Sequence, residues 1–262
     1  MCERRNKIVF VNEPILDVCN DDLIKFINDI QFIFSPNVTI TMQVTNLGIR
    51  GIEIKGDICD DNIIKLISLC DYLKINDKLI IEEKMIELIN NQFIYRSFTT
   101  FHQNDDIIRN EVHNYFKKIQ FNNILCVGGE CYIYPKLIEH DMCCIMTDYK
   151  DIYEDAMYNK SGTYYYLVDY NTFYIPILSI DAAIFNTAIF NAAIFNVAKS
   201  GLSVSMCECL NKSNINTIFI ISCNFKSHER NWSILKKTYN IITSNTIKTS
   251  YIVSIYHLEK IK

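Results

Sequence analysis

The chain has 262 residues, 49% of them hydrophobic and 21% charged, and a formal net charge of −4. These values predict a soluble globular protein with one large core or two modest ones. The mild acidity excludes a basic field over the whole surface, so a contact with nucleic acid would need a local basic patch.

The N-terminal sequence and the amino-acid usage predict the compartment and the origin of the protein. The N-terminus "MCERRNKIVFVNEP" contains no uninterrupted apolar stretch of the length that a secretion signal needs, which predicts a cytoplasmic protein. Isoleucine makes up about one residue in six, a bias that resembles translation of a very AT-rich genome such as that of a large DNA virus of protists. A viral protein of this kind would act in the host cytoplasm.

The 11 cysteines predict neither a zinc site nor a disulfide framework. No two of them form a CxxC pair, and the spacings Cys143-Cys144 and Cys207-x-Cys209 do not match the paired ligands of structural zinc sites. We therefore expect no bound metal, and we expect most of these residues to be reduced, small core hydrophobes.

Residues 1 to 90 are predicted to form a small α+β domain. The strings "KIVFV" and "NVTITMQVTNLGIRGIEI" are typical of strands, and "NDDLIKFINDIQFIF" and "DDNIIKLISLCDYLKI" are typical of helices that begin at Asn or Asp caps. The second helix has a broad apolar face made of Ile63, Ile64, Leu66, Ile67 and Leu69. Core packing explains this face, and a helix that binds a partner is the alternative.

Residues 91 to 262 are predicted to form an α/β domain of the Rossmann-like class. After residue 105 helical and strand patterns alternate, which is typical of a parallel sheet. In chain order the segments are the helix "DDIIRNEVHNYFKKI", the strand "NILCV", the turn and helix "GGECYIYPKLIEH", the strands "MCCIMTDY", "YYYLVDY" and "AAIFN", the helix "LSVSMCECLNK", the strand "NTIFIIS", the helix "SHERNWSILKKTY" and a closing strand "SYIVSIYHL".

A glycine turn follows the first of these strands and an acid follows the second. This arrangement holds an adenosine ligand in Rossmann-like folds, although "VGGE" is not GxGxxG and a purely structural turn explains it equally well. The aromatic run Tyr164, Tyr165 and Tyr166 offers stacking surfaces for bases, with strand or core placement as the alternative.

The segment at 173–198, "FYIPILSIDAAIFNTAIFNAAIFNVA", is apolar in bulk but is not a membrane span. Asp181, Asn186, Asn191 and Asn196 interrupt it, and each would cost free energy in hydrocarbon. Its "AIFN" repeat has a period of five, which suits neither a helix nor a strand. We expect one buried strand here, with the surplus copies forming a loop or an extra hairpin.

Five short strings occur in a fixed order in the second domain. They are "RSFTTFHQN" (96–104), "LCVGGECYI" (125–133), "NVAKSGL" (196–202), "SCNFKSHERN" (222–231) and "TSYIVSIYHL" (249–258). In order and spacing they resemble the SFxQxN element, the cofactor turn, the D/N-P-P-R-x-G-L loop, the SCNPxTxxxD motif and the terminal TxHxE element of the uridine-C5 RNA methyltransferases. The resemblance covers residues 97 to 262.

This resemblance implies S-adenosylmethionine as cofactor and a uracil of RNA as substrate. Cys223 stands at the place of the family's nucleophile, which attacks C6 of uracil so that C5 can accept the methyl group. An inert buried thiol is the alternative for this residue. The residues implied to bind cofactor are Gly128, Gly129, Asp148, Asn196 and Thr100. The candidate RNA contacts are Lys199, Lys226 and Arg230.

The departures from the family pattern concern the same site. The family's Gln falls on Thr100, its two prolines on Val197 and Ala198, its arginine on Lys199, and its proton-abstracting Glu on Val253. A valine cannot accept a proton. Glu259 is too close to the end of the last strand to replace it, and Glu229 is a local substitute only if geometry allows. Glu130 adds a negative charge to the cofactor turn, so cofactor binding is expected to be weak or lost.

The predicted function is therefore that of a methyltransferase-like scaffold subunit, catalytically inactive, that binds RNA, protein or both in an RNA-processing or translation complex. The alternative is an active S-adenosylmethionine-dependent RNA uridine-C5 methyltransferase with Cys223 as nucleophile. Neither hypothesis involves a membrane or a metal.

Overall fold

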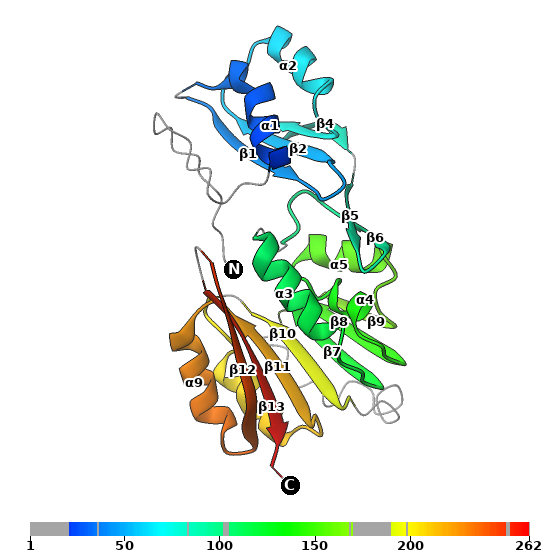
Figure 1. The fold of residues 1–262 in the computed structure, drawn as a ribbon, viewed down its shortest axis with the longest axis vertical. Helices are drawn as coiled ribbons and strands as arrows, with labels where there is room; N and C mark the ends of the chain where they lie inside the picture. Colours follow the sequence, from blue (N-terminus) through cyan, green and yellow to red (C-terminus); the bar gives the residue numbers. More distant parts are fainter. Residues whose placement is uncertain are drawn as a thin grey trace. The chain divides into compact units, whose positions relative to one another are not determined.

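The structure is a computed structural model in which residues 21–35, 37–82, 84–101, 105–167, 169, 190–197, 199–249 and 252–261 are described. The strand expected at "KIVFV" lies outside these residues. The chain divides into two compact units between Thr99 and Thr100 (Figure 1). Among the described residues no helix is both long and apolar enough to span a membrane.

The N-terminal unit is a four-stranded sheet with two helices. Its elements are α1 (Asp21–Asp29), the 3-10 turn η1 (Gln31–Ile33), β1 (Thr39–Val44), β2 (Arg50–Lys55), α2 (Asp60–Ile67), β3 (Tyr72–Ile75) and β4 (Lys78–Glu82). The strands lie in the order β1-β2-β3-β4, and only β2 and β3 are parallel. Side chains of α1, α2 and the sheet share one core, with Phe26, Ile52, Ile54 and Leu66 fully buried.

The second helix of this unit is shorter than its sequence predicts. It ends at Ile67, and the last residues of "DDNIIKLISLCDYLKI" form β3. Leu73 and Ile75 are buried while their neighbours are half-buried, so burial alternates as in a strand. The apolar face is also only partly used for packing, because Leu66 is buried while Ile64 and Ile67 are exposed.

A two-stranded hairpin follows, formed by β5 (Met85–Ile89) and β6 (Gln92–Arg96). Its turn residues Asn90 and Asn91 have φ angles of 51° and 59°, a left-handed conformation that Asn tolerates better than most residues. The domain boundary expected at residue 90 falls inside this hairpin, about nine residues before the division between the two compact units.

The C-terminal unit is a seven-stranded sheet covered by helices. Its elements are α3 (Asp106–Phe116), β7 (Asn123–Gly128), α4 (Tyr134–Leu137), β8 (Met142–Thr147), α5 (Lys150–Tyr158), β9 (Tyr164–Leu167), β10 (Ala192–Asn196), α8 (Val204–Lys212), β11 (Thr217–Ser222), α9 (Phe225–Leu235), β12 (Tyr239–Lys248) and β13 (Ile252–Lys260). The strand order is β12-β13-β11-β10-β7-β8-β9.

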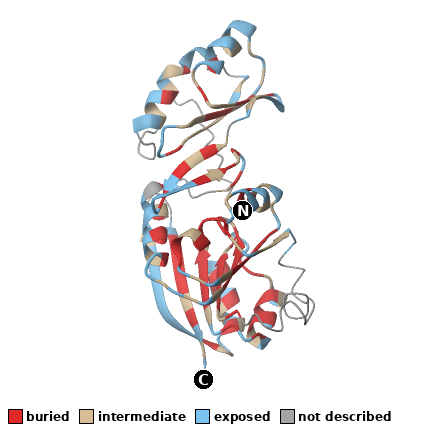
Figure 2. Cartoon of the chain, turned by 90° about the vertical axis from the view of Figure 1, so that its right-hand side faces the viewer, coloured by how far each residue is buried: buried red, intermediate tan, exposed pale blue. Residues whose placement is uncertain are grey.

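The Rossmann-like α/β architecture predicted from the sequence is confirmed. Five strands, β11, β10, β7, β8 and β9, are parallel. One expectation about the sheet is wrong, because the "SYIVSIYHL" segment does not close it. This segment forms most of β13, which runs antiparallel between β11 and β12. The edge strand on this side is β12, which is exposed along most of its length and pale in Figure 2, whereas β13 beside it is mostly buried.

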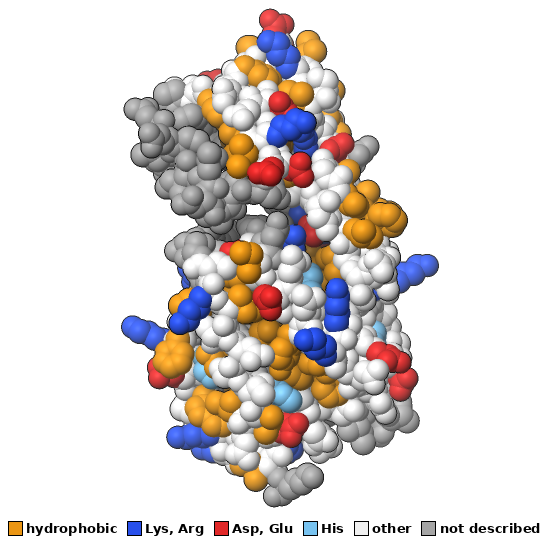
Figure 3. Space-filling view, viewed as in Figure 1, with side chains coloured by type: hydrophobic (Ala, Val, Ile, Leu, Met, Phe, Trp, Pro, Cys, Tyr) orange, Lys and Arg blue, Asp and Glu red, His pale blue; other side chains and the backbone are white. Residues whose placement is uncertain are grey.

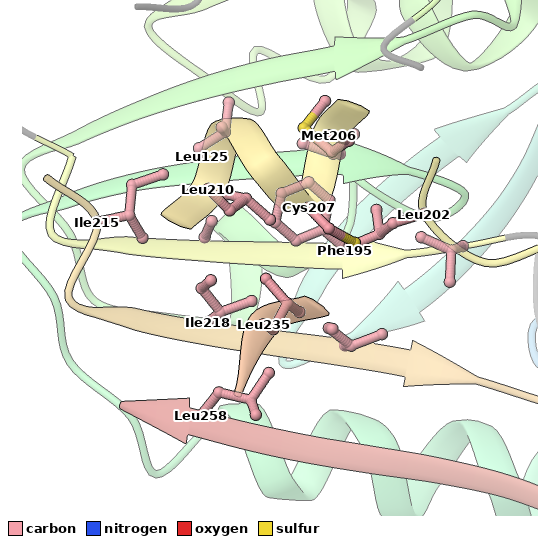
Figure 4. Close-up of a cluster of buried hydrophobic side chains, with 14 of the residues drawn as sticks. Leu125, Phe195, Leu202, Met206, Cys207, Leu210, Ile215, Ile218, Leu235 and Leu258 are labelled. Atoms are coloured by element: carbon pink, nitrogen blue, oxygen red, sulfur yellow. The ribbon is translucent and has the colours of Figure 1, made fainter. Parts of the chain in front are cut away.

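Helices cover both faces of this sheet, and each face has its own side chains. Leu125, Ile218 and Phe195 pack against α8 through Met206, Cys207 and Leu210, as Figure 4 shows. On the other face Phe219 of β11 contacts Phe116 of α3, and Phe116 contacts Tyr134 of α4. The sheet is therefore buried on both sides, which is typical of parallel sheets and explains the continuous apolar runs of its central strands.

The segment rich in "AIFN" contributes one buried strand, as expected. The last copy forms β10, in which Ala192, Ala193, Ile194 and Phe195 are buried. The first copy, with Asp181 before it and Asn186 at its end, lies outside the described residues, and of the second copy only Phe190 and Asn191 are described. The tyrosine run at 164–166 forms β9, so strand placement explains it.

His228 of α9 makes the stability of this unit depend on pH. Its ring is buried and stacks on Tyr256, and its Nδ1 has no hydrogen-bond partner among the described residues. Burial lowers the pKa of His228 from 6.5 to about 4. The unfolded chain therefore binds the proton first, so stability is fully present above about pH 6.5 and is lost as the pH falls toward 4.

The expected loss from this single group is at most about 3 kcal/mol. Urea denaturation at a series of pH values between 7.5 and 4 measures it, and the variant His228→Phe keeps an aromatic ring against Tyr256 while removing the titrating group. We expect a flatter pH profile in the variant. His257, whose pKa is also lowered by burial, remains in both proteins and serves as the internal control. Equal slopes in the two proteins would contradict the prediction.

Candidate functional site

The candidate site lies where the order of the strands reverses. The chain passes from β7 outward to β8 and β9 and then returns to the other side of β7 as β10. In open parallel sheets ligands bind at such a switch point, outside the carboxyl ends of the strands. Gly128 and Asn196 end β7 and β10 and are register partners at this edge.

The glycine turn after β7 needs glycine at both positions for different reasons. Gly128 has a φ of 88°, which side chains rarely tolerate. Gly129 is tightly packed, because a Cβ added there would lie 2.8 Å from Cδ1 of Phe101. The Gly129 amide donates a 3.0 Å hydrogen bond to the carbonyl oxygen of Asn196. The segment around Phe101 therefore lies directly against the turn, as the resemblance implies for this region.

The next residue, Glu130, directs a buried carboxylate into the protein. It is 2% exposed, and its backbone has a φ of 54°. Tyr134 Oη donates to Glu130 Oε2 at 3.3 Å, and Asn196 Nδ2 lies 3.2 Å from the same oxygen and 2.9 Å from Tyr134 Oη. Burial, followed by the charge of Glu130, raises the pKa of the Tyr134 phenol, so this hydroxyl stays protonated.

This triad of Glu130, Tyr134 and Asn196 was not predicted as a unit. Sequence analysis treated Glu130 only as a charge that disturbs the turn, and it chose Asn196 from the resemblance. The spacing of four residues between Glu130 and Tyr134 gives no helical signal, because Glu130 lies in the turn before α4 with a φ of 54° and α4 begins only at Tyr134. No sequence pattern places Asn196, 62 residues after Tyr134, at the same point.

Two other predicted cofactor residues occupy different settings. Asp148 follows the end of β8 and is exposed, and partial desolvation, followed by the charge of Asp169, raises the pKa of its carboxyl group. Thr100 is buried, and its Oγ1 donates a 2.5 Å hydrogen bond to Oδ2 of Asp155, a fully buried residue of α5. Asp148 is thus available to a ligand at this edge, whereas the Thr100 hydroxyl is engaged within the protein.

Cys223 follows β11 directly and differs from the other thiols. Of the nine cysteines that the structure describes, seven are buried, Cys59 is exposed and Cys223 is half-buried. Burial raises the pKa of Cys126, Cys131 and Cys144, which are core residues as expected. The position of Cys223, between the end of a sheet strand and the start of α9, places it at the carboxyl edge.

The turn that carries Cys223 is held by its two neighbours in the sequence. Ser222 Oγ accepts a 3.2 Å hydrogen bond from the backbone amide of Asn224. Asn224 caps α9 by accepting from the amide of Lys226 at 3.1 Å, and its Nδ2 donates to the carbonyl of Lys199 at 2.8 Å. The "SCN" turn is therefore fixed to the "NVAKSG" loop, two segments that the resemblance also places together.

The far side of this loop is fixed by α9. Arg230 Nη2 donates to the carbonyl oxygens of Ser200 and Leu202, at 2.5 Å and 2.7 Å. Asn231, which is 1% exposed, accepts from the Leu202 amide at 3.0 Å and donates to its carbonyl at 2.7 Å. Arg230 was predicted as an RNA contact, but two of its hydrogen bonds support the loop instead.

Two of the predicted RNA contacts stand at this edge. Lys199 and Lys226 are both exposed, and Asn224 connects their backbones. On the face drawn in Figure 3, blue side chains are scattered and form no continuous basic area. This agrees with the net charge of −4.

The position of the family's proton-abstracting Glu falls at the same end of the β11–β13 ladder as Cys223. The last pair of this ladder is Ser222 and Ser254; Cys223 follows Ser222 in the chain and Val253 precedes Ser254. Glu259 is paired with Thr217 at the start of β11, about 20 Å from Cys223 at about 3.3 Å per residue. Glu229 lies on α9 and is exposed. The register therefore excludes Glu259 as a replacement for the missing base.

Comparison with solved structures shows the same fold. A tRNA (uracil-54, C5)-methyltransferase of Pyrococcus abyssi, in complex with S-adenosyl-L-homocysteine, matches 91% of this chain with a TM-score of 0.63 and 14% identity. This chain covers 65% of the length of that structure. TrmK of M. capricolum, in complex with S-adenosyl-homocysteine, matches 58% of this chain and 68% of its own, with a TM-score of 0.42 and 12% identity.

An rRNA methylase of Streptococcus thermophilus matches 62% of this chain and 100% of its own, with a TM-score of 0.42 and 10% identity. No protein-family model matches the sequence, and no curated protein matches it. At 14% sequence identity the likeness to a solved structure shows a shared fold and no more. The Pyrococcus abyssi structure, with its TM-score of 0.63, shows this shared fold over 91% of the chain.

Proposed function

We propose that this chain is a methyltransferase-like RNA-binding protein that does not complete methyl transfer. The observation that supports this proposal best is that Val253 stands where the resemblance implies a proton acceptor, next to the Ser222–Ser254 pair that ends the β11–β13 ladder beside Cys223. Attack of the Cys223 sulfur on C6 of a uracil needs only the thiolate, but the methylated C5 must then lose its proton to a base. Val253 is also buried, 5% exposed, and its side chain has no proton acceptor to offer.

The cofactor that the proposal implies is S-adenosylmethionine, which supplies an electrophilic methyl group when bound. The exposed carboxylate of Asp148 after β8 fits the hydroxyls of a ribose at the switch point. The turn after β7 fits the methionine half less well, because Phe101 packs on Gly129 and the Glu130 carboxylate is folded inward against Tyr134 and Asn196. We therefore expect weak binding of this cofactor.

RNA binding is the activity that the same edge retains. The turn with Cys223 and the loop with Lys199 are joined through Asn224, and neither depends on the missing base. The fold shared with a tRNA methyltransferase supports RNA as the polyanion that these lysines contact in this proposal. A scaffold role within a larger RNA-processing or translation complex is consistent with this arrangement, and the half-exposed apolar face of α2 offers a surface for a protein partner.

Transfer of a labelled methyl group from S-adenosylmethionine to total tRNA and rRNA tests the proposal. We expect no incorporation above background, both in the wild type and in Cys223→Ala, because the C5 proton has no acceptor. The variant is also expected to bind RNA as the wild type does and to lose about 1 kcal/mol of stability at most. Cysteine-dependent incorporation at uracil C5 would overturn the proposal in favour of an active uridine-C5 methyltransferase.

Calorimetry with S-adenosyl-homocysteine provides the control for that assay. If the dissociation constant of S-adenosyl-homocysteine is well above the micromolar range, weak binding at the turn after β7 explains part of the lack of methyl transfer. If binding is micromolar and no methyl is transferred, the missing base at Val253 alone explains it. The variant Val253→Glu, which places a carboxylate at that position, is then the one to assay.

A further inference from the structure

One exposed aromatic side chain stands beside the candidate nucleophile. Phe225 follows the Cys223-Asn224 turn as the first residue of α9, and it is 65% exposed. A phenylalanine buried on folding gains about 2 kcal/mol, so one left in water at this place forgoes most of that stabilisation. The family pattern has proline here, so the resemblance predicts no aromatic ring at this position.

The surroundings of Phe225 are polar and, on balance, positive. Lys226 is its neighbour in the helix, and Asn224 connects the backbone of Lys226 to that of Lys199 by hydrogen bonds of 3.1 Å and 2.8 Å. Arg230 lies further along the same helix and holds the loop that carries Lys199. Glu229, one turn after Phe225, is the single acid within this stretch of α9. Three cations against one carboxylate favour a polyanion over an apolar partner.

We propose that Phe225 is a stacking platform for a base of single-stranded RNA, with Lys199 and Lys226 contacting the flanking phosphates. This inference rests on the proposed function and names the RNA contact of that same site. An exposed ring beside paired lysines is the arrangement by which proteins bind unpaired nucleotides, because every base offers a face for stacking while its phosphates are held by charge. Duplex RNA does not expose such faces, so the site selects single strands.

Fluorescence anisotropy with a labelled, unstructured 12-nucleotide RNA tests this inference, with a duplex of the same length as competitor. We expect Phe225→Ala to weaken binding of the single strand by about 5- to 100-fold, the range for loss of one stacked base. Phe225→Trp keeps an aromatic face and is expected to bind at least as well as the wild type. Because Phe225 is exposed, the substitutions leave the fold intact, which the emission of the single tryptophan, Trp232, verifies.

The salt dependence separates stacking from charge. We expect Phe225→Ala to leave the slope of log affinity against log salt unchanged, and Lys199→Ala with Lys226→Ala to reduce its magnitude by about 1.4, or about 0.7 per phosphate contact. Phe93→Ala, which removes a comparably exposed phenylalanine (61%) from the N-terminal unit, is the matched control and is expected to bind as the wild type.

The outcomes distinguish the two proposals. If the wild type binds the RNA and Phe225→Ala binds equally well, the stacking platform is refuted and the proposed function stands. If the wild type binds neither the single strand nor the duplex, RNA binding itself is refuted, and the exposed ring belongs to a protein contact instead.

Discussion

The substitution Arg96→Met is expected to lower the free energy of unfolding of the N-terminal unit by about 3–5 kcal/mol. This is the usual cost of removing one partner of a buried ion pair. Arg96 Nε donates to Glu87 Oε1 at 2.8 Å across the β5–β6 hairpin, and both side chains are at most 3% exposed. Arg96 Nη1 also donates to Gln43 Oε1 at 2.6 Å. The substitution thus removes the cation bonded to the buried Glu87 carboxylate and the donor bonded to the part-buried amide oxygen of Gln43.

Hydrogen exchange measured by mass spectrometry is suited to this prediction, because it follows each unit separately. Peptides from β1 to β6 are expected to exchange faster in Arg96→Met, while the emission of Trp232 in the C-terminal unit provides the reference. The double variant Arg96→Met with Glu87→Met removes both charges and is expected to recover most of the stability. A single variant that is as stable as the double variant would show that the pair contributes little.

The parallel core of the C-terminal unit could be predicted from sequence because its strands are buried on both faces. "NILCV", "MCCIMTDY" and "NTIFIIS" contain short apolar runs bounded by polar residues, and they became β7, β8 and β11. The bounds of β7 and β11 agree within one residue, whereas β8 ends two residues before the predicted strand. A strand that is buried on both faces is a continuous apolar run, and this run can be recognised in the sequence without knowing which strand lies beside it.

Elements without such burial escaped prediction. β12 is exposed over most of its length, so "YNIITSNTIK" has neither an apolar run nor an alternation to reveal it. β12 is held in the sheet by its backbone pairing with the largely buried strand β13, and its own side chains give no sign of this pairing. α5 was missed for a related reason, because its few buried residues are Ile152, Asp155 and Ala156, and a buried acid weakens the apolar pattern. The hairpin around Asn90 and Asn91 was not predicted either, although two consecutive asparagines favour a turn with positive φ angles.

In the candidate site, the sequence predicted positions better than it predicted contacts. Gly128, Asn196 and Cys223 all stand at the carboxyl ends of parallel strands, where strand order alone places them. What each side chain contacts depends on residues far along the chain. Arg230 and Asn231 turn toward the loop at 200–202, about thirty residues earlier, and no local pattern distinguishes a loop-binding arginine from an RNA-binding one.

Loss of the Asn231 amide is expected to lower the free energy of unfolding of the C-terminal unit by about 2–3 kcal/mol in Asn231→Ala. The side chain is 1% exposed and makes two hydrogen bonds to the backbone of Leu202, which is itself fully buried. The Leu202 carbonyl keeps Arg230 as a donor, but its amide loses the acceptor that Asn231 Oδ1 provides at 3.0 Å. An unpaired buried amide costs about 1–3 kcal/mol, and the emptied volume adds to this.

Urea denaturation followed by the emission of Trp232 measures this loss directly, because the tryptophan is the next residue of the same helix. Asn240→Ala, on the exposed strand β12, is the matched control and is expected to change stability by less than about 0.5 kcal/mol. A loss of less than about 1 kcal/mol in Asn231→Ala would mean that water reaches the Leu202 amide. The loop that carries Lys199 would then be held mainly by Arg230 and Asn224, and its position beside Cys223 would depend on those two side chains alone.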